Sequence, residues 1–287
     1  MREWVSVNGE LMPAAQATVS AFDSGFLQGV GLFETLRAYA GRPFRLDRHI
    51  ARLRASAAAL GWTVIPEAEV LEDNVSQVVA ASDVDDLRVR LTVTTGRVPS
   101  GAAERDVGLT IVASAAPHVD YPRELYQKGA TVTLSPYAQG NDPTFGHKTT
   151  SYFARLAALR GAHQAGATEA LWRTPDGRLA EGSISNLFLV IDGELCTPPL
   201  NTPVLPGITR AAVLEAAARV RVPASEEPLV PEDLRQCDEA FITNSMIEIL
   251  PVVRVGREPI GNEKPGEITI RLYEALSSLI REELQLE

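Results

Sequence analysis

Strand patterns and helix patterns alternate along most of this chain, and that alternation strongly limits what the chain can fold into. Asn8-Gly9, the strongest short turn signal, joins two short apolar segments into an N-terminal hairpin. Residues 32–39 alternate in polarity as a strand does, whereas residues 48–60 and 67–81 have helical spacing. The sequence therefore predicts a mixed α/β fold, of the α+β kind in its first half.

The helix predicted over residues 48–60 carries polar residues on one side. We expect Asp47 to cap its start and Gly61 to end it. Four of its residues fall at helical spacing and should share one face, namely His49, Arg52, Leu53 and Ser56. This face is a candidate for binding a ligand.

A break in the pattern of predicted strands and helices near the middle of the chain predicts two domains. The first half should also contain strands at residues 43–46, 87–95 and 107–114. Residues 115–122 contain two prolines and fit neither periodicity, which is typical of a linker. The second half is expected to contain strands at 130–134, 187–191, 194–197, 240–243 and 251–255, and helices at 152–166, 209–220 and 268–284. We predict an N-terminal α/β domain at 1–116, a linker at 117–126 and a C-terminal domain at 127–287.

Composition excludes several classes of partner. The chain has 287 residues and a formal net charge of −10, which argues against nucleic acid and anionic membranes as partners. No apolar run reaches the length of a membrane-spanning helix, and the N-terminus has no apolar signal core. Two widely separated cysteines, Cys196 and Cys237, indicate a reducing compartment, so we expect a cytoplasmic protein. No metal site is expected.

Lysine is rare in this chain, and one lysine has unusual neighbours. Only three are present, and a lysine can act as a neutral amine nucleophile whereas arginine stays protonated. Lys128 and Lys264 occupy turn-like or helix-end positions typical of the surface. Lys148 lies instead in Gly146-His147-Lys148-Thr149-Thr150-Ser151-Tyr152, just before an apolar helical run. It is either an imine-forming amine or an ordinary lysine near a helix start.

Glu181 is the candidate partner for a heterocyclic nitrogen. A carboxylate beside a pyridine nitrogen keeps that ring protonated and able to accept electrons. Glu181 is followed by Gly182 and Ser183, which allow close approach of a flat ligand to the backbone. The alternative is an exposed glutamate beside a hairpin.

Residues 205–210 read Leu-Pro-Gly-Ile-Thr-Arg and suggest a phosphate site. A Pro-Gly turn that leads into a helix presents backbone N–H groups and the Thr209 hydroxyl to an anion. Arg52 could direct a guanidinium at the same phosphate. The alternatives are an ordinary helix start and an exposed arginine on an amphipathic helix. An amine, a carboxylate and an anion site together suit pyridoxal phosphate.

These segments, in their order and spacing, resemble the class IV aminotransferase family, which has fold type IV. That family includes branched-chain aminotransferase, D-amino acid aminotransferase and 4-amino-4-deoxychorismate lyase. The resemblance covers most of the chain. It is carried by residues 33–35, 45–53, 148–152, 180–188, 205–210 and 241–245.

The resemblance implies a fold and a set of roles. Two α/β domains would hold pyridoxal 5′-phosphate in the cleft between them, in a homodimer or larger oligomer. Lys148 would form the imine with the cofactor and then shuttle protons. The other implied cofactor ligands are Glu181 for the pyridine nitrogen, Arg52, Ile208, Thr209 and Ser245 for the phosphate, and Tyr152 for the ring oxygen.

Substrate residues are less well marked by the resemblance. Thr94-Thr95-Gly96 stands where D-amino acid aminotransferases have an arginine before the glycine, so the substrate carboxylate would fall to Arg88, Arg90 or Arg97, with Phe33 nearby. Residues 243–251 and 148–152 look more like aminodeoxychorismate lyase. That resemblance favours pyruvate elimination to give 4-aminobenzoate. The alternative is transamination of branched-chain or D-amino acids with a 2-oxo acid.

Overall fold

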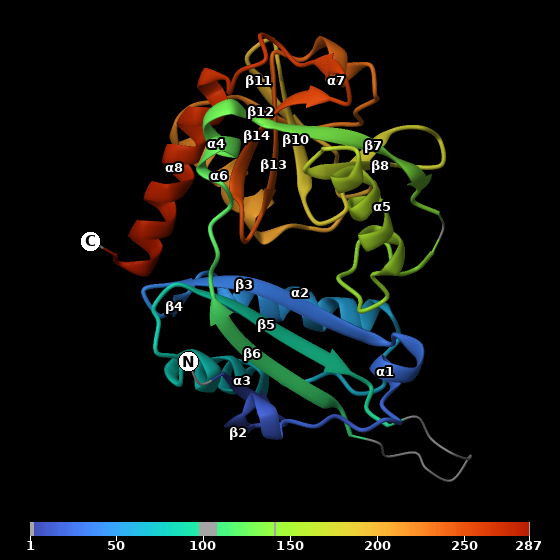
Figure 1. Ribbon diagram of the computed structural model, residues 1–287, viewed down its shortest axis with the longest axis vertical. Helices are drawn as coiled ribbons and strands as arrows, with labels where there is room; N and C mark the ends of the chain where they lie inside the picture. The colour runs from blue at the N-terminus through green and yellow to red at the C-terminus, as the bar shows by residue number, and fades with distance from the viewer. Residues whose placement is uncertain (1–2, 98–107, 141, 287) are drawn as a thin grey trace. The chain divides into compact units, whose positions relative to one another are not determined.

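The computed structural model describes residues 3–97, 108–140 and 142–286 and divides into two compact units (Figure 1). Unit 1 comprises Met1–Val119 together with His147–Ser151, and unit 2 comprises Asp120–Gly146 and Tyr152–Glu287. The lysine segment therefore packs with unit 1 although the chain on both sides of it belongs to unit 2. The division into 1–116, 117–126 and 127–287 stays a prediction.

Unit 1 is built on an antiparallel sheet of six strands in the order β2-β1-β6-β5-β3-β4. Its strands are β1 Trp4–Val7, β2 Glu10–Pro13, β3 Gly31–Tyr39, β4 Arg42–Pro43, β5 Leu87–Thr94 and β6 Thr110–Pro117. Its helices are α1 Ser24–Gln28, α2 Leu46–Ala59 and α3 Ala68–Ala80, with a short 3₁₀ turn at Ala14–Gln16.

The two faces of this sheet differ in chemistry because side chains alternate along each strand. Helices α2 and α3 cover one face, where a core forms from Leu32, Leu36, Leu53, Val75, Val89 and Leu91. The opposite face presents residues of the other parity, among them Phe33 and Thr35 on β3 opposite Thr92 and Arg90 on β5. The second face therefore carries Phe33 beside polar side chains, whereas the helix-covered face is mainly apolar and also carries Glu34, which meets His49 and Arg52 of α2.

Unit 2 contains a mixed sheet of nine strands in the order β12-β11-β10-β13-β14-β7-β8-β9, with β15 paired to β14. Pairs β11–β12, β14–β7 and β7–β8 are parallel. The strands are β7 Ala130–Ala138, β8 Glu169–Arg173, β9 Leu179–Gly182, β10 Asn186–Ile191, β11 Glu194–Thr197, β12 Ala224–Glu226, β13 Glu239–Asn244, β14 Glu248–Val255 and β15 Glu258–Pro259.

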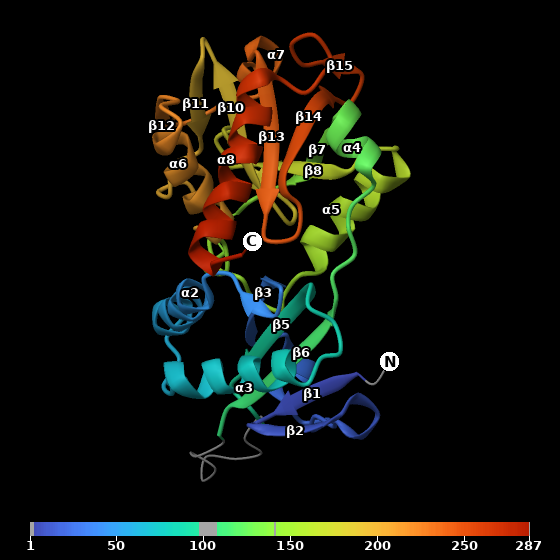
Figure 2. The same ribbon diagram turned by 90° about the vertical axis from the view of Figure 1, so that its left-hand side faces the viewer.

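The helices of unit 2 pack on this sheet. Helix α5 lies against β7 and β8, whereas α6 and α8 lie side by side next to β13, as Figure 2 shows. Their bounds are α4 Arg123–Lys128, α5 Phe153–Gln164, α6 Ile208–Arg219, α7 Asp233–Gln236 and α8 Glu267–Leu284. No helix among residues 3–97, 108–140 and 142–286 is long and apolar enough to cross a membrane.

Most predicted elements are present, but three local predictions were wrong. Asp47 does not cap α2, because the helix begins at Leu46 after Arg45, whose φ of 51° is left-handed. The strand expected at 43–46 is reduced to β4, since Leu46 already belongs to the helix. The strand expected at 107–114 instead runs to Pro117, and Val107 lies outside the described residues.

Candidate active site

Lys148 is held against β3 by backbone pairing within unit 1. The Phe33 N–H donates to the Lys148 carbonyl at 2.9 Å, and the Thr150 N–H donates to the Gly31 carbonyl at 2.8 Å. Leu32 and Thr149 form an antiparallel bridge between these bonds. Residues 148–150 thus extend along the first part of β3, which fixes the backbone from which the amine projects.

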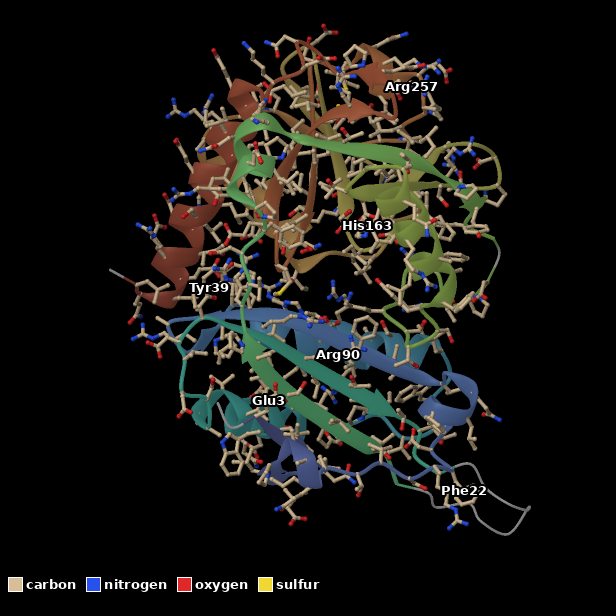
Figure 3. All side chains as sticks on the ribbon, in the orientation of Figure 1. Glu3, Phe22, Tyr39, Arg90, His163 and Arg257 are labelled. Carbon is tan, nitrogen blue, oxygen red and sulfur yellow. The ribbon has the colours of Figure 1, made fainter. Side chains whose placement is uncertain are left out.

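The Lys148 amine lies over the ring of Phe33, which it shares with an arginine. Its Nζ is 4.4 Å from the ring centroid, and the Arg90 guanidinium carbon is 3.9 Å from the same centroid (Arg90 is labelled in Figure 3). An aromatic face attracts both cations. Among the predicted substrate residues, Phe33 therefore contacts Lys148 directly, and Arg90 contacts the same ring. Arg88, two residues along β5, is exposed.

Arg52 is buried and already paired. Only 9% of its side chain is exposed, so the alternative of an exposed arginine is wrong. Its Nε donates to Glu34 Oε1 at 2.9 Å and its Nη2 donates to Glu34 Oε2 at 2.5 Å. The ring N–H of His49 at Nδ1 donates to Glu34 Oε2 at 2.7 Å. The face predicted for α2 is thus an internal cluster centred on Glu34.

The pKa values of this cluster follow from burial and charge. Burial raises the pKa of Glu34, but the Arg52 charge and the His49 and Arg52 hydrogen bonds outweigh it and bring the value to about 2. Burial lowers the pKa of His49. The hydrogen bond and charge of Glu34 raise it, whereas the positive charges of Arg52 and Lys148 lower it, and the net pKa is lowered. The cluster therefore holds an ionised Glu34, a charged Arg52 and a neutral His49 near neutral pH.

The two other lysines lie at the surface, as predicted. Lys264 is exposed, and 74% of the Lys128 side chain is exposed beside Glu124. Lys148 is half-buried, which separates it from both.

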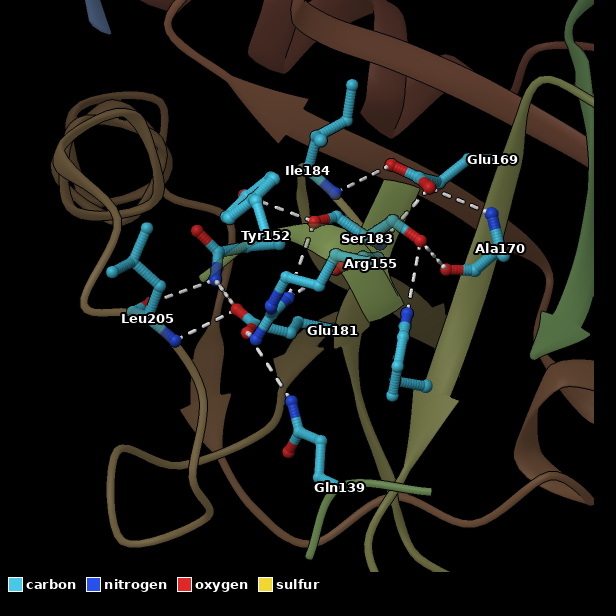
Figure 4. Close-up of polar contacts among 12 residues, drawn as sticks. Gln139, Tyr152, Arg155, Glu169, Ala170, Glu181, Ser183, Ile184 and Leu205 are labelled. Atoms are coloured by element: carbon cyan, nitrogen blue, oxygen red, sulfur yellow. Dashed lines mark hydrogen bonds and ion pairs between the residues drawn. The ribbon is translucent and has the colours of Figure 1, made fainter. Parts of the chain in front are cut away.

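Glu181 is the centre of a polar cluster in unit 2 (Figure 4). It is 3% exposed, so the alternative of an exposed glutamate is wrong. Its Oε2 accepts the Leu205 N–H at 2.8 Å, and its Oε1 accepts Arg155 Nη2 at 2.6 Å. The amides of Asn186 and Gln139 each lie at 3.4 Å from the carboxylate. No role was predicted for Arg155 from the sequence. It lies three residues after Tyr152, on the same side of the helix.

The start of α6 lies directly beside this cluster. Gly207 is the N-cap of α6, and Thr209 in its first turn is buried. Asn186 donates to the Leu205 carbonyl at 2.9 Å, and a Cβ on Gly207 would overlap its Oδ1. The first N–H groups of a helix have no partner within the helix and suit an anion. Asn186 therefore connects Glu181 to the turn that leads into α6, whose first residues are the predicted phosphate residues Ile208 and Thr209.

A second buried carboxylate, Glu169, shapes the loop that follows Glu181. It accepts the Ser183 N–H at 3.1 Å, the Ile184 N–H at 3.2 Å and the Ser185 hydroxyl at 2.9 Å. The Tyr152 hydroxyl donates to the Ser183 carbonyl at 3.2 Å, so this loop is also tied to the start of α5.

Ser245, another predicted phosphate residue, is half-buried in the turn between β13 and β14. The preceding Asn244 donates to the Ile184 carbonyl at 3.0 Å and accepts the Met246 N–H at 2.8 Å. The turn and Tyr152 are therefore both hydrogen-bonded to the loop that contains Ser183 and Ile184.

Comparison with known proteins identifies the family. The model of the class IV aminotransferase family matches residues 31–255. The chain is 34% identical to a putative branched-chain-amino-acid aminotransferase of Methanocaldococcus jannaschii, over 96% of each chain. It is 31% identical to aminodeoxychorismate lyase of Bacillus subtilis, over 98% of this chain and 94% of that one.

Solved structures give the same result. The branched-chain aminotransferase of Escherichia coli superposes with a TM-score of 0.91 at 27% identity, over 98% of this chain and 95% of that one. The 4-amino-4-deoxychorismate lyase of Pseudomonas aeruginosa gives 0.83 at 30% identity, over 98% and 100%. The fold is the two-domain α/β architecture of the fold type IV enzymes. The chain belongs to the class IV aminotransferase family of pyridoxal-phosphate enzymes.

The residues present fit the cofactor of that family. Unit 1 supplies an amine at Lys148 and a buried guanidinium at Arg52, and unit 2 supplies a buried carboxylate beside a helix N-terminus. An aldehyde, a phosphate and a protonatable ring nitrogen need these kinds of group. The close packing of Gly207 on Asn186 leaves no room for a larger residue at the start of α6.

Proposed function

We propose that the chain is a pyridoxal-phosphate-dependent aminotransferase that moves the amino group of an α-amino acid to a 2-oxo acid. When bound, pyridoxal phosphate supplies an aldehyde that condenses with amines and a pyridine ring that withdraws electron density. Lys148 would hold the cofactor covalently and would move the proton of the substrate α-carbon as base and acid. Glu181 would face the pyridine nitrogen and keep it protonated.

The proposal assigns phosphate binding to the residues that the resemblance to the family implies. Arg52 supplies a guanidinium that Glu34 holds from two sides. The Ile208 amide and the Thr209 hydroxyl supply neutral donors at the start of α6, and Ser245 supplies another hydroxyl. Tyr152 would contact the ring oxygen.

One observation supports a substrate that carries both an amine and a carboxylate. Arg90 and Lys148 both contact the ring of Phe33. The Arg90 guanidinium carbon is 3.9 Å and the Lys148 Nζ is 4.4 Å from the ring centroid. In this proposal the substrate amine lies near Lys148 and the substrate carboxylate on the Arg90 side of the Phe33 ring, since arginine binds carboxylates through two parallel hydrogen bonds. Arg88 is exposed and is the weaker candidate.

Aminodeoxychorismate lyase is the second candidate function. The 31% identity to the Bacillus subtilis lyase supports it, as do the lyase-like residues 243–251 and 148–152. The substrate of that reaction also carries an amine and a carboxylate, so the same Lys148 and Arg90 would serve it. The two functions differ in product: only the lyase releases pyruvate from aminodeoxychorismate without a 2-oxo acid acceptor.

Two further properties belong to the proposal. The enzyme would be a homodimer, as the resemblance to the family implies, and light scattering on the purified protein would give its mass. It would act in the cytoplasm, because Cys196 and Cys237 are both buried as free thiols, which a reducing compartment favours.

The first prediction concerns the proposed lysine. Lys148→Ala should abolish covalent cofactor attachment and lower turnover by about 10³-fold or more, because it removes both the covalent link and the proton carrier. Attachment is measured by mass spectrometry after borohydride reduction. Lys128→Ala is the matched control, since it removes an exposed lysine, and it should leave both quantities unchanged.

The assay also separates the two candidate functions. Amine exchange that requires a 2-oxo acid supports the aminotransferase, whereas pyruvate release without an acceptor supports the lyase. Full turnover of Lys148→Ala in either assay would refute the assignment of this residue. Arg90→Met should raise KM for the amino acid much more than Arg88→Met does.

A further inference from the structure

Arg155 is a buried cation that points into the Glu181 cluster from α5. Only 14% of its side chain is exposed, and its Nη2 donates to Glu181 Oε1 at 2.6 Å. Its Nη1 lies 3.2 Å from the Gly182 carbonyl and 3.4 Å from the Ser183 carbonyl, so it also supports the backbone that follows Glu181 (Figure 4).

Aromatic rings enclose this guanidinium. Its central carbon lies 5.8 Å from the ring centroids of Phe145 and Trp172, and 6.0 Å from that of Tyr152. Burial lowers the pKa of Arg155, but the Glu181 carboxylate and then the Tyr152 oxygen raise it by more, so the group stays charged. A planar cation between rings has little freedom to leave the carboxylate.

The remaining hydrogen-bond partners of Glu181 are neutral. They are the Leu205 backbone N–H at 2.8 Å and the side-chain amides of Asn186 and Gln139 at 3.4 Å each. Within the described residues, Arg155 is thus the charged hydrogen-bond partner of this carboxylate. Any second cation that approaches Glu181 must share it with Arg155.

We propose that Arg155 is a positioning residue that competes with the cofactor's pyridine nitrogen for the Glu181 carboxylate and so limits how strongly that nitrogen is held. The inference rests on the proposed function, because it assumes that Glu181 faces the ring nitrogen of pyridoxal phosphate. A carboxylate between two cations interacts less strongly with each of them than with one alone. Without Arg155, the ring nitrogen would be the single cationic partner of Glu181.

A cofactor analogue without the ring nitrogen isolates this effect. Pyridoxamine 5′-phosphate and its 1-deaza analogue differ at that atom, and neither has the aldehyde that links to Lys148. Their dissociation constants are measured by fluorescence titration of cofactor-free protein. The ratio of the two constants reports the contact between Glu181 and the nitrogen, whereas damage to the phosphate site changes both constants equally.

In Arg155→Met, the preference for pyridoxamine phosphate over the deaza analogue should rise by about tenfold, which corresponds to one pKa unit of altered interaction. Arg155→Lys keeps the charge and should stay within about twofold of the wild-type preference. In the Glu181→Gln background, Arg155→Met should leave the preference unchanged. Should Arg155→Met fail to fold, Arg155→Gln keeps polar contacts to the two carbonyls without the charge and should show the same rise.

An unchanged or lower preference in a folded neutral variant would overturn the inference, because Arg155 would then act only as structural support. The same outcome follows if the rise persists without the Glu181 carboxylate. These results differ from failure of the proposed function, in which wild-type protein would bind neither pyridoxamine phosphate nor pyridoxal phosphate.

Discussion

Each unit contains a buried arginine–glutamate pair, and the two pairs use their partners in opposite ways. In unit 1, Arg52 is the proposed cofactor ligand, and Glu34 holds it from the protein side at 2.5 Å. In unit 2, Glu181 is the proposed ligand, and Arg155 holds it at 2.6 Å. A phosphate needs a cation and a pyridinium nitrogen needs an anion, so each buried ligand has a partner of the opposite charge.

This arrangement answers a physical requirement. An isolated charge in the protein interior is strongly unfavourable, and removing one member of a buried pair leaves such a charge behind. The partners Glu34 and Arg155 therefore stabilise the ligands Arg52 and Glu181 when no cofactor is bound. In the proposed site, each partner would also compete with the cofactor for its ligand.

Glu169 shows what happens to a buried carboxylate whose contacts are neutral donors. Burial raises its pKa, and the hydrogen bonds from three backbone N–H groups and the Ser185 hydroxyl offset this only in part. For Glu34, burial acts in the same direction, yet the Arg52 charge reverses the result and the pKa falls to about 2. Both carboxylates are buried and hydrogen-bonded, so the nearby Arg52 charge is the main difference between a raised pKa at Glu169 and a lowered pKa at Glu34.

The largest effect on stability is expected at the first pair. Glu34→Gln should lower the free energy of unfolding of the cofactor-free protein by about 3–5 kcal/mol, because Arg52 stays buried without its counter-charge. Urea unfolding followed by far-UV circular dichroism measures this change. A loss below about 1 kcal/mol would contradict the comparison, since Arg52 would then not depend on Glu34.

The same pair predicts a pH dependence with a defined sign. The pKa of Glu34 is about 2 in the folded protein and 4.5 in its ordinary state, so its stabilisation is complete above pH 4.5. That stabilisation is lost as the pH falls from 4.5 towards 2, and by linkage it amounts to about 3 kcal/mol. The stability difference between wild type and Glu34→Gln should therefore shrink over this range. A difference that stays constant from pH 5 to pH 2.5 would show that Glu34 does not titrate as described.

The elements that could be predicted are those set by local pattern. The helical spacing of His49, Arg52, Leu53 and Ser56 correctly predicted one shared face, and the alternation at residues 32–39 correctly predicted β3. Short elements were missed: α1 spans five residues in a Gly-rich loop, and α4 spans six residues after Pro122. One turn of helix has too few residues for a periodic signal.

The pairings of the site could not be predicted, because they depend on tertiary contacts. Arg155 and Glu181 lie 26 positions apart, and they meet only because α5 packs on β7 and β8 while β9 extends the same sheet. Asp47 looked like the helix cap, but the cap is the left-handed Arg45, two residues earlier. Glu34 belongs to the family-like segment 33–35, but its pairing with Arg52 and His49 depends on the packing of α2 against β3.

The smallest effect is expected at a surface pair of the same chemistry. Arg219 Nη1 lies 2.6 Å from Glu282 Oε2, the same separation as in the Arg155–Glu181 pair, but 47% and 65% of the two side chains are exposed. Solvent screens exposed pairs and hydrates either charge alone, so Glu282→Gln should change the free energy of unfolding by less than about 1 kcal/mol. The measurement is the same urea titration used for Glu34→Gln. A loss as large as that of Glu34→Gln would mean that contact distance, not burial, sets the strength of these pairs, and the distinction between interior and surface pairs would fail.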